Sequence, residues 1–189
     1  MDNRKLHPSL FPRNVAEDIE LAVLEQEHAA AFLELVQRDR AYLRAWVPWV
    51  DRRQSLANVN QYFHWVEERI RDDLGFCVGI FYKGSLVGEM KAHTIDWLAR
   101  SAIVGYWIAS DHQGKGIVTR ATRSLVDLLI KELDIKRVEM TCATGNARSY
   151  KIPERLGFTR EGTLRQAECL YGETWHDVYM YSVLDSEWS

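Results

Sequence analysis

The sequence predicts an α+β protein in which a mixed, mostly antiparallel sheet is flanked by helices. Apolar residues follow the helical spacing of three and four positions in some segments and form short strand-like runs in others. A strand, a helix and a second strand over residues 101–143 predict a right-handed parallel crossover. The 189 residues contain no repeat or obvious linker, so we expect one domain over residues 1–189.

The first quarter of the chain alternates between the two patterns. Residues 1–17 are polar and contain prolines, which is typical of an arm or an edge strand. Residues 19–24 are strand-like, whereas residues 27–39 are rich in good helix formers. Residues 43–51 hold two tryptophans around a proline.

An amphipathic helix and a β-hairpin follow. Ser55 is a good N-cap residue and Gly75 a good stop, and the apolar positions between them have helical spacing. Those positions are Leu56, Val59, Phe63, Val66 and Ile70. Residues 76–82 and 86–96 are strand-like and flank a short turn at residues 83–85, which predicts the hairpin.

The second half begins with an apolar strand at residues 101–109, and a long helix follows a glycine-containing turn. One face of that helix carries Ala121, Leu125, Leu128, Leu129 and Leu133. Residues 136–143 predict another strand and residues 146–158 a short helix. Two strand-like segments joined through a turn around Gly172 end the chain: residues 159–165 and 175–184.

Composition and charge narrow the class of function. The net charge of −3 gives no strong basic field for nonspecific binding of nucleic acid. No apolar run approaches the roughly 20 residues of a membrane span, and the N-terminus lacks the apolar core of a signal peptide. Cys77, Cys142 and Cys169 are scattered, and the histidines have no metal spacing. We expect a cytoplasmic protein that needs no metal.

The turn after the strand at residues 101–109 carries the strongest chemical signal. It reads Gln113-Gly-Lys-Gly116, and the N–H groups at the start of the following helix attract anions such as phosphate. The two glycines allow close approach of a ligand, and Lys115 adds a positive charge. The nucleotide loops GxxxxGK[ST] and GxGxxG are absent. These residues alone leave a phosphate cradle and a plain turn equally open.

The spacing Gln113-x-x-Gly116 resembles the acyl-CoA loop of the GNAT superfamily of N-acetyltransferases, usually written Q/R-x-x-G-x-G/A. Val118 departs from that pattern, so its side chain must point away from the phosphates. Further segments resemble, in order, the RimJ/RimL-type branch over residues 10–189: LRAWVPWVD, VGYWI, QGKGIVTRA, NARSYKIPERLGFTREGTLR and DVYMYSVL. The resemblance implies the GNAT fold and acetyl-CoA as cosubstrate.

The resemblance also implies which residues bind the donor. The thioester carbonyl would meet backbone N–H groups of the strand before the loop, from Trp107, Ile108 and Ala109. Asn146, in the segment N-x-x-S, would bind the pantetheine arm, although capping of the next helix is the ordinary role of such a residue. The pyrophosphate would lie on the loop formed by Gln113, Gly114, Lys115, Gly116, Ile117, Val118 and Thr119.

Two residues are candidates for proton transfer. By the resemblance, Ser149 would protonate the departing thiolate and Glu168 would take a proton from the acceptor amine, directly or through water. Capping for the serine and simple exposure for the glutamate remain alternatives. Glu89 is a second candidate base, on a strand that could face the same cleft.

Other reactive-looking residues are assigned structural roles. Cys142 lies in an apolar strand that disfavours its thiolate, so direct attack by the amine is preferred to a cysteine nucleophile. His176 and Asp177 are adjacent in a strand and point to opposite faces, which excludes a dyad. Trp46 and Trp49 could line the acceptor pocket, but packing is their more common role.

The interpretation is an acetyl-CoA-dependent N-acetyltransferase that modifies a protein α-amine, for example of a ribosomal protein. A small amine, such as a polyamine or an antibiotic, is the alternative acceptor. A catalytically silent acyl-CoA-binding module is the third hypothesis. The family tendency implies a homodimer.

Overall fold

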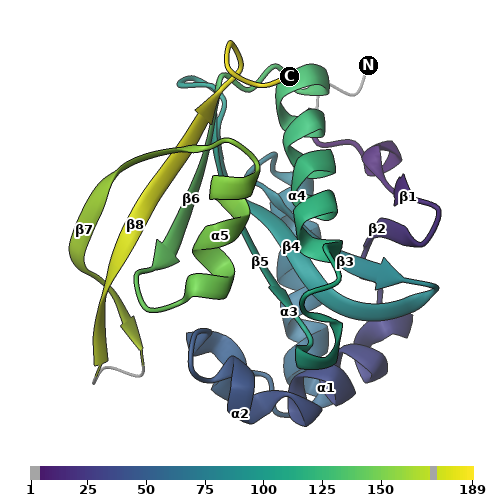
Figure 1. The fold of residues 1–189 in the computed structure, drawn as a ribbon. Helices are drawn as coiled ribbons and strands as arrows, with labels where there is room; N and C mark the ends of the chain where they lie inside the picture. Colours follow the sequence, from purple (N-terminus) through teal and green to yellow (C-terminus); the bar gives the residue numbers. More distant parts are fainter. Residues whose placement is uncertain (1–4, 171–173) are drawn as a thin grey trace.

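The computed structural model describes residues 5–170 and 174–189. Its strands form one eight-stranded sheet in the order β1-β2-β3-β4-β5-β6-β8-β7, with helices on both faces (Figure 1). Every neighbouring pair is antiparallel except β5 and β6, which are parallel. The predicted α+β class and the parallel crossover are therefore confirmed. The strands are β1 (Arg13–Ala16), β2 (Ile19–Val23), β3 (Phe76–Tyr82), β4 (Ser85–Asp96), β5 (Ser101–Ile108), β6 (Arg137–Ala143), β7 (Thr159–Leu170) and β8 (Thr174–Leu184).

The longer helices follow the predicted segments, whereas α2 and the 3₁₀ helices at Pro48–Arg52 and Ser110–His112 were not predicted. The expected helix at 27–39 begins as a 3₁₀ turn and then becomes α1, and the tryptophan segment at 43–51 holds a 3₁₀ helix. The long helix after the glycine turn ends in a π-helical turn at Leu128–Glu132, which buries both Leu128 and Leu129. The helices are α1 (Ala29–Arg38), α2 (Arg40–Leu43), α3 (Leu56–Arg71), α4 (Ile117–Asp127) and α5 (Ala147–Arg155), with 3₁₀ helices at Pro8–Leu10, Gln26–His28, Pro48–Arg52 and Ser110–His112.

Local signals explain several element boundaries. The Ser55 side chain accepts a hydrogen bond from the Asn58 N–H and caps α3, as expected. The β3–β4 hairpin turns on Lys83 and Gly84, both with positive φ, which is the two-residue turn that suits the strand twist. Residues 13–16 form the edge strand β1. The predicted turn around Gly172 lies outside the described residues.

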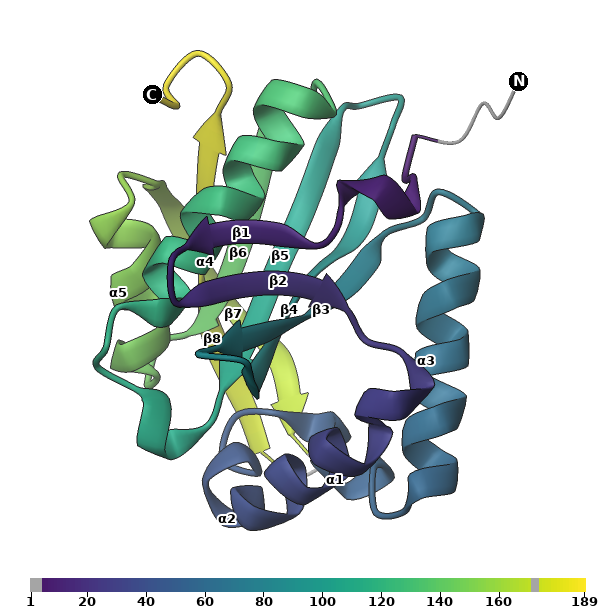
Figure 2. The same cartoon turned by 90° about the vertical axis from the view of Figure 1, so that its right-hand side faces the viewer.

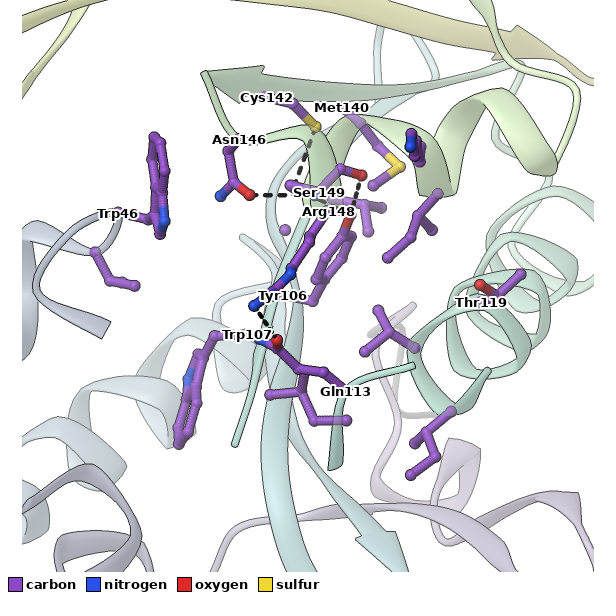
Figure 3. Close-up of a pocket in the computed structure, with 18 of the residues that line it drawn as sticks. Trp46, Tyr106, Trp107, Gln113, Thr119, Met140, Cys142, Asn146, Arg148 and Ser149 are labelled. Atoms are coloured by element: carbon purple, nitrogen blue, oxygen red, sulfur yellow. Dashed lines mark hydrogen bonds between the residues drawn. The ribbon is translucent and has the colours of Figure 1, made fainter. Parts of the chain in front are cut away.

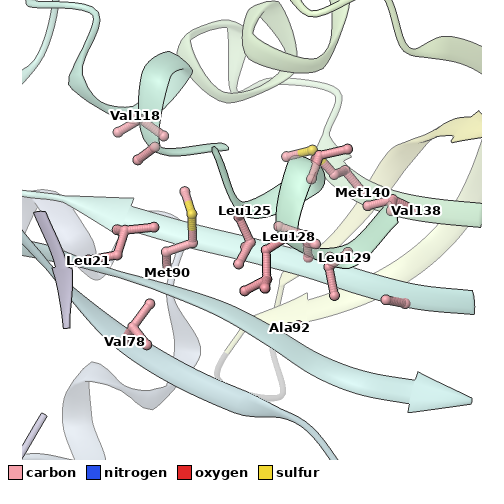
Figure 4. Packing of buried hydrophobic residues seen from close by; sticks show 14 of the residues in the cluster. Leu21, Val78, Met90, Ala92, Val118, Leu125, Leu128, Leu129, Val138 and Met140 are labelled. Carbon is pink, nitrogen blue, oxygen red and sulfur yellow. The ribbon is translucent and has the colours of Figure 1, made fainter. Parts of the chain in front are cut away.

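The two sheet faces carry separate hydrophobic clusters. Helices α4 and α5 pack on one face, and α1 and α3 on the other (Figure 2). Because side chains alternate along a strand, Met90 and Ala92 of β4 face the α4 cluster (Figure 4), whereas Glu89 faces α3 through Tyr62. Leu125 of α4 has no exposed surface, and truncating such a side chain to alanine costs about 2–5 kcal/mol. The cluster on the α4 face, which includes Leu125 of α4 and Ile108 of β5, therefore fixes the position of the glycine turn relative to β5.

Strands β5 and β6 pair only at their beginnings. Residues 101–103 of β5 are in register with residues 137–139 of β6, and the two strands separate beyond them (Figure 1). The last part of β5, including Tyr106 and Trp107, therefore has no ladder partner on the β6 side among the described residues. This fork in the sheet places the functional cleft.

Candidate active site

The fork opens into a cleft of about 1000 Å³ that is lined from α2, β4, β5, β6, α4, α5 and β7. We refer to its two ends by their residues (Figure 3). The loop end comprises Gln113, Gly114 and residues 116–119 with the α5 side chains Arg148, Lys151 and Arg155. The Glu168 end comprises Trp46, Lys91, His93 and Glu168.

The glycine turn has the geometry of an anion cradle. Gly114 and Gly116 both have φ of +72°, a conformation that L side chains rarely adopt, and no atom lies within 4 Å of where a Cβ would be. Gly116 is the N-cap of α4, so the free N–H groups of the first turn point into the cleft. Val118 is 5% exposed and packs in the hydrophobic cluster under α4, and it also borders the cleft.

Lys115 lies differently from the rest of the turn. Its ammonium is 5.9 Å from the centre of the Tyr82 ring, and its side chain does not line the cleft. Only its backbone amide remains for a ligand in the loop. Arg148, Lys151 and Arg155 of α5 line the cleft, as does Arg120 of α4, which is paired with Asp18 at 3.1 Å.

These α5 cations were not predicted, although their spacing of three and four residues is a readable signal of one helix face. Arg155 donates to the Thr119 hydroxyl at 3.0 Å and ties α5 to the start of α4. Arg148 donates to the Gln113 side-chain oxygen at 2.7 Å (Figure 3). Gln113 in turn donates to the Tyr42 hydroxyl, so one glutamine links α5 to α2 across the cleft.

The end of β5 narrows the choice of backbone donor. The Ala109 N–H donates to the Val87 carbonyl at 2.8 Å and is therefore committed to β4. Successive amides of a strand point to opposite sides, so the Ile108 N–H points toward the gap between β5 and β6. Of the three expected residues, Ile108 best fits a donor to a ligand in the fork, and the Trp107 side chain packs in the α1–α3 cluster.

Ser149 lies in the first turn of α5, at the centre of a small hydrogen-bond group. Its hydroxyl donates to the Cys142 sulfur at 3.4 Å and lies 3.2 Å from the Tyr106 hydroxyl. The Tyr106 hydroxyl also donates to the Ser149 carbonyl at 2.9 Å, which holds the start of α5 over β5. The Tyr106 ring packs against the core cluster on the α4 face, and the residue also lines the cleft.

Asn146 and Cys142 flank this group. The Asn146 side-chain oxygen accepts the Ser149 N–H at 3.2 Å, so the capping role is present; the cap uses the amide oxygen and not the amide nitrogen. Burial raises the pKa of the Cys142 thiol to about 11, which keeps it protonated at neutral pH. The Cys142 thiol is thus poorly suited to act as a nucleophile.

Glu168 occupies the opposite end of the cleft. It follows an irregularity in β7 between Leu164 and Glu168, and it faces His176 of β8 across the ladder. The Glu168 side chain is half-buried, and burial raises its pKa above the ordinary glutamate value, against the lowering effect of His176 and Lys91. A carboxylate with a raised pKa in a cleft is suited to accept a proton near neutral pH.

Glu89 does not reach this cleft, in contrast to its role as second candidate. Its side chain is only 1% exposed, accepts a hydrogen bond from Trp107 Nε1 at 3.0 Å and is also bonded by the Tyr62 hydroxyl. The ring of Tyr62, from α3, covers the carboxylate, and sequence periodicity could not show this cover. Both carboxylate oxygens are used in holding β4, β5 and α3 together.

The His176–Asp177 pair and the two tryptophans of residues 43–51 were the remaining candidates. The Asp177 carboxylate accepts the Gln166 N–H at 2.8 Å, while the His176 ring faces Trp46 at 6.1 Å, so the two residues form no dyad. Trp49 packs against Trp107 at 5.7 Å, and Trp46 lines the cleft.

Comparison with known proteins identifies the family. Residues 18–159 match the model of the acetyltransferase (GNAT) domain. The chain belongs to the GNAT acetyltransferase family. The YdaF N-acetyltransferase of Bacillus subtilis is 35% identical over 180 residues, which cover 95% of this chain and 98% of YdaF.

Solved structures of GNAT enzymes have the same fold. The microcin C7 self-immunity acetyltransferase MccE, in complex with acetyl-CoA and AMP, has a TM-score of 0.89 at 27% identity, with 95% and 98% of the two chains covered. The ribosomal L7/L12 α-N-protein acetyltransferase RimL, in complex with coenzyme A, has a TM-score of 0.86 at 26% identity, with 90% and 96% covered. The chain is thus a GNAT N-acetyltransferase with RimL-like relatives.

The GNAT cleft fits acetyl-CoA on its own geometry. The loop end offers an N–H cradle where two glycines leave open space, and basic side chains of α5 border it. Among residues 5–170 and 174–189, no three His, Cys, Asp or Glu side chains gather as metal ligands would. No helix in the described part of the chain has the length and apolarity to cross a membrane.

Proposed function

We propose that this GNAT enzyme acetylates the α-amine of a peptide or protein by direct transfer from acetyl-CoA. The observation that carries the proposal is that Ser149 and Glu168, from α5 and β7, border one cleft at the fork. Acetyl-CoA supplies an activated acetyl group as a thioester. The amine attacks that carbonyl, the new C–N bond replaces the C–S bond, and the thiolate leaves.

The loop end would hold the nucleotide part of the donor. N–H groups of residues 114–119 would meet the pyrophosphate, with charge supplied by Arg148, Lys151 and Arg155. Asn146 would offer its amide nitrogen to the pantetheine arm. The Ile108 N–H, pointing into the fork, would bind the thioester oxygen as negative charge develops there.

Glu168 and Ser149 would move the two protons. An α-amine is largely protonated at neutral pH, so a base with a raised pKa must remove one proton, directly or through water. The Ser149 hydroxyl would donate to the thiolate, and the Tyr106 hydroxyl, which lies 3.2 Å away and donates to the Ser149 carbonyl, would hold Ser149 in place. The path needs neither a metal ion nor a covalent acyl-enzyme.

A peptide acceptor is supported by the relatives. RimL is named as an α-N-protein acetyltransferase, and the family relationship extends over nearly the whole chain. A small-molecule acceptor is the second candidate, because MccE, equally similar in fold, is in complex with AMP.

The deciding experiment is an acceptor screen. Purified protein is incubated with acetyl-CoA and either N-terminal peptides, including those of ribosomal proteins, or polyamines and aminoglycosides. Free thiol release and mass spectrometry report transfer. Acetylated peptide α-amines support the proposal, and transfer only to small amines supports the alternative. Binding of acetyl-CoA without any transfer contradicts both and indicates a silent module.

We also propose a cytoplasmic homodimer. Edge strand β7 is exposed from Thr159 to Ala167, and Leu164 and Trp175 beside it are 45% and 59% exposed. An edge strand leaves backbone groups unpaired, and the two exposed apolar side chains add a surface that favours pairing with a second copy. Light scattering should give twice the chain mass, and Trp175→Ser with Leu164→Ser should give the monomer. The control is Leu98→Ser, a change in the exposed β4–β5 turn.

A further inference from the structure

Lys91 lines the cleft, and the proposed transfer reaction assigns it no role. It lies on β4 in register with Gly105 of β5, one of the two forked strands. A Cβ at position 105 would come within 3.2 Å of Lys91 Cε and 3.8 Å of Lys91 Cγ. The aliphatic part of Lys91 therefore lies over the bare backbone of Gly105, which directs the ammonium toward the fork.

The Lys91 ammonium has no partner in the described part of the chain. The side chain is half-buried and lines the cleft, yet no described residue forms a hydrogen bond or ion pair with it. Two lysines outside the cleft behave differently, since Lys131 pairs with Asp127 and Lys136 with Asp185, both at 2.6 Å. A partly desolvated charge without a partner is unfavourable unless a ligand completes it.

The nearest acid does not satisfy this charge. Lys91 lowers the pKa of Glu168, but the two groups form no ion pair within 4.0 Å, and burial raises the pKa of Glu168 more than Lys91 lowers it. The Glu168 end thus holds one carboxylate and one ammonium, separated and both available.

The other basic groups near Lys91 are either uncharged or already hydrogen-bonded. Burial, together with the charges of Lys91 and Arg69, lowers the pKa of His93 to about 4, so this ring is neutral at physiological pH. The Arg69 guanidinium donates to the backbone carbonyls of Leu74 and His93. Among the described residues of the Glu168 end, Lys91 is the cation that a ligand can reach.

We propose that Lys91 forms a subsite for an anionic group, a carboxylate, that lies a few atoms from the acceptor amine. An acceptor with an amine and a nearby carboxylate complements Glu168 and Lys91 at once. Two sources have this chemistry: a peptide that begins with an acidic residue, and a free amino acid. The inference rests on the proposed function and adds the acceptor class to it.

The test compares acceptors that differ in the charge beside the amine, with each rate corrected for the fraction of neutral amine. A peptide beginning with Asp is paired with the same peptide beginning with Asn, and free alanine is paired with alanine amide. The wild-type enzyme should prefer the acidic member of at least one pair by about tenfold in kcat/KM, the size of effect that one charge-assisted hydrogen bond gives. The pair that shows the preference identifies the source.

Lys91→Met should reduce that ratio to about one while the neutral acceptor is still acetylated and CoA affinity is unchanged. Lys91→Arg should retain the preference, and Lys83→Met, in the β3–β4 turn outside the cleft, serves as the control. If Lys91→Met does not fold, the same ratio in the wild type must fall with added salt.

Three results overturn the inference. These are equal acetylation of both members of every pair by the wild type, a preference that persists in Lys91→Met, and a wild-type ratio that does not change with salt. In these cases transfer to the neutral acceptors still supports the proposed function. No transfer to any acceptor contradicts the proposed function, and the inference falls with it.

Discussion

Arg148 on α5 donates a hydrogen bond of 2.7 Å to the side chain of Gln113, which in turn bonds to Tyr42 on α2. This link crosses the cleft beside the glycine turn. It joins three segments that are far apart in the sequence, and it lies next to residues 114–119, which would hold the pyrophosphate of the donor. Binding of the donor should therefore depend on it.

The first prediction concerns this link. Arg148→Met and Gln113→Leu should each lower the free energy of unfolding by about 0.5–1.5 kcal/mol, because a charge-assisted hydrogen bond is lost at a partly solvated site. The double variant should cost less than the sum, with a coupling of about 0.5–1 kcal/mol in urea denaturation. Additive effects would show that the pair contributes no coupling.

The second prediction concerns Glu168. Glu168→Gln should lower kcat by about 100-fold or more with CoA affinity unchanged, because a general base is removed without changing the loop end. In the wild type, activity should fall as pH drops through the raised pKa of Glu168, so the acid limb should lie above the ordinary glutamate value of about 4.3. The variant should lack that limb. Wild-type activity that stays flat down to pH 4 would exclude Glu168 as the base.

The third prediction separates Ser149 from its neighbours. Ser149→Ala should lower kcat by about 10- to 100-fold, since the thiolate loses its proton donor. Tyr106→Phe should have a smaller effect in the same direction. Cys142→Ala should retain nearly full activity, because the Cys142 thiol stays protonated and attacks nothing. Loss of activity in Cys142→Ala with a normal fold would support a covalent route instead.

The fourth prediction concerns the glycine turn. Gly116→Ala should cost about 1–2 kcal/mol of stability, because alanine resists the left-handed conformation, although its Cβ has space. It should also weaken acetyl-CoA binding as the cradle deforms. Gly162→Ala, on the exposed part of β7 where the space is equally open and φ is not positive, is the matched control. Equal effects of the two substitutions would refute a special role for the turn.

The fifth prediction concerns His93. Its pKa is about 4 in the folded protein and about 6.5 when unfolded, so the unfolded chain binds more protons between these values. Stability should therefore fall as pH drops from 6.5 toward 4. His93→Asn should flatten that dependence by ~1–2 kcal/mol, discounted because the ring is partly solvated. His64→Asn on the exposed face of α3 should leave it unchanged, in denaturation at pH 4.5 and 7.5.

The parts of the fold that sequence predicted correctly depend on local signals. The cap at Ser55, the turn at Lys83–Gly84 and the crossover from β5 to β6 each follow from residues close together in the chain. Glu89 was placed wrongly because strand periodicity gives a face but not what covers that face. The ring of Tyr62, 27 residues away, decides it.

In the candidate site, too, the features set by neighbouring residues were predicted and those set by distant residues were not. The glycine turn was predicted because its chemistry lies in four consecutive residues, whereas Lys115 turns to Tyr82 on another strand. The charges on α5 were readable from spacing and were missed. The position of the Lys91 side chain in the cleft could not be predicted from the sequence, because it depends on Gly105 of the neighbouring strand.

The separation of β5 and β6 has a kinetic consequence. The cleft is lined from both faces of the sheet, with Lys91 on the α3 side and the α4–α5 groups on the other. Two reactants could enter such a passage from opposite mouths, so neither would obstruct the other. Initial-rate plots at varied donor and acceptor should then intersect, as for a ternary complex, and a molecule tethering coenzyme A to the acceptor should thread the sheet and bind more tightly than either half.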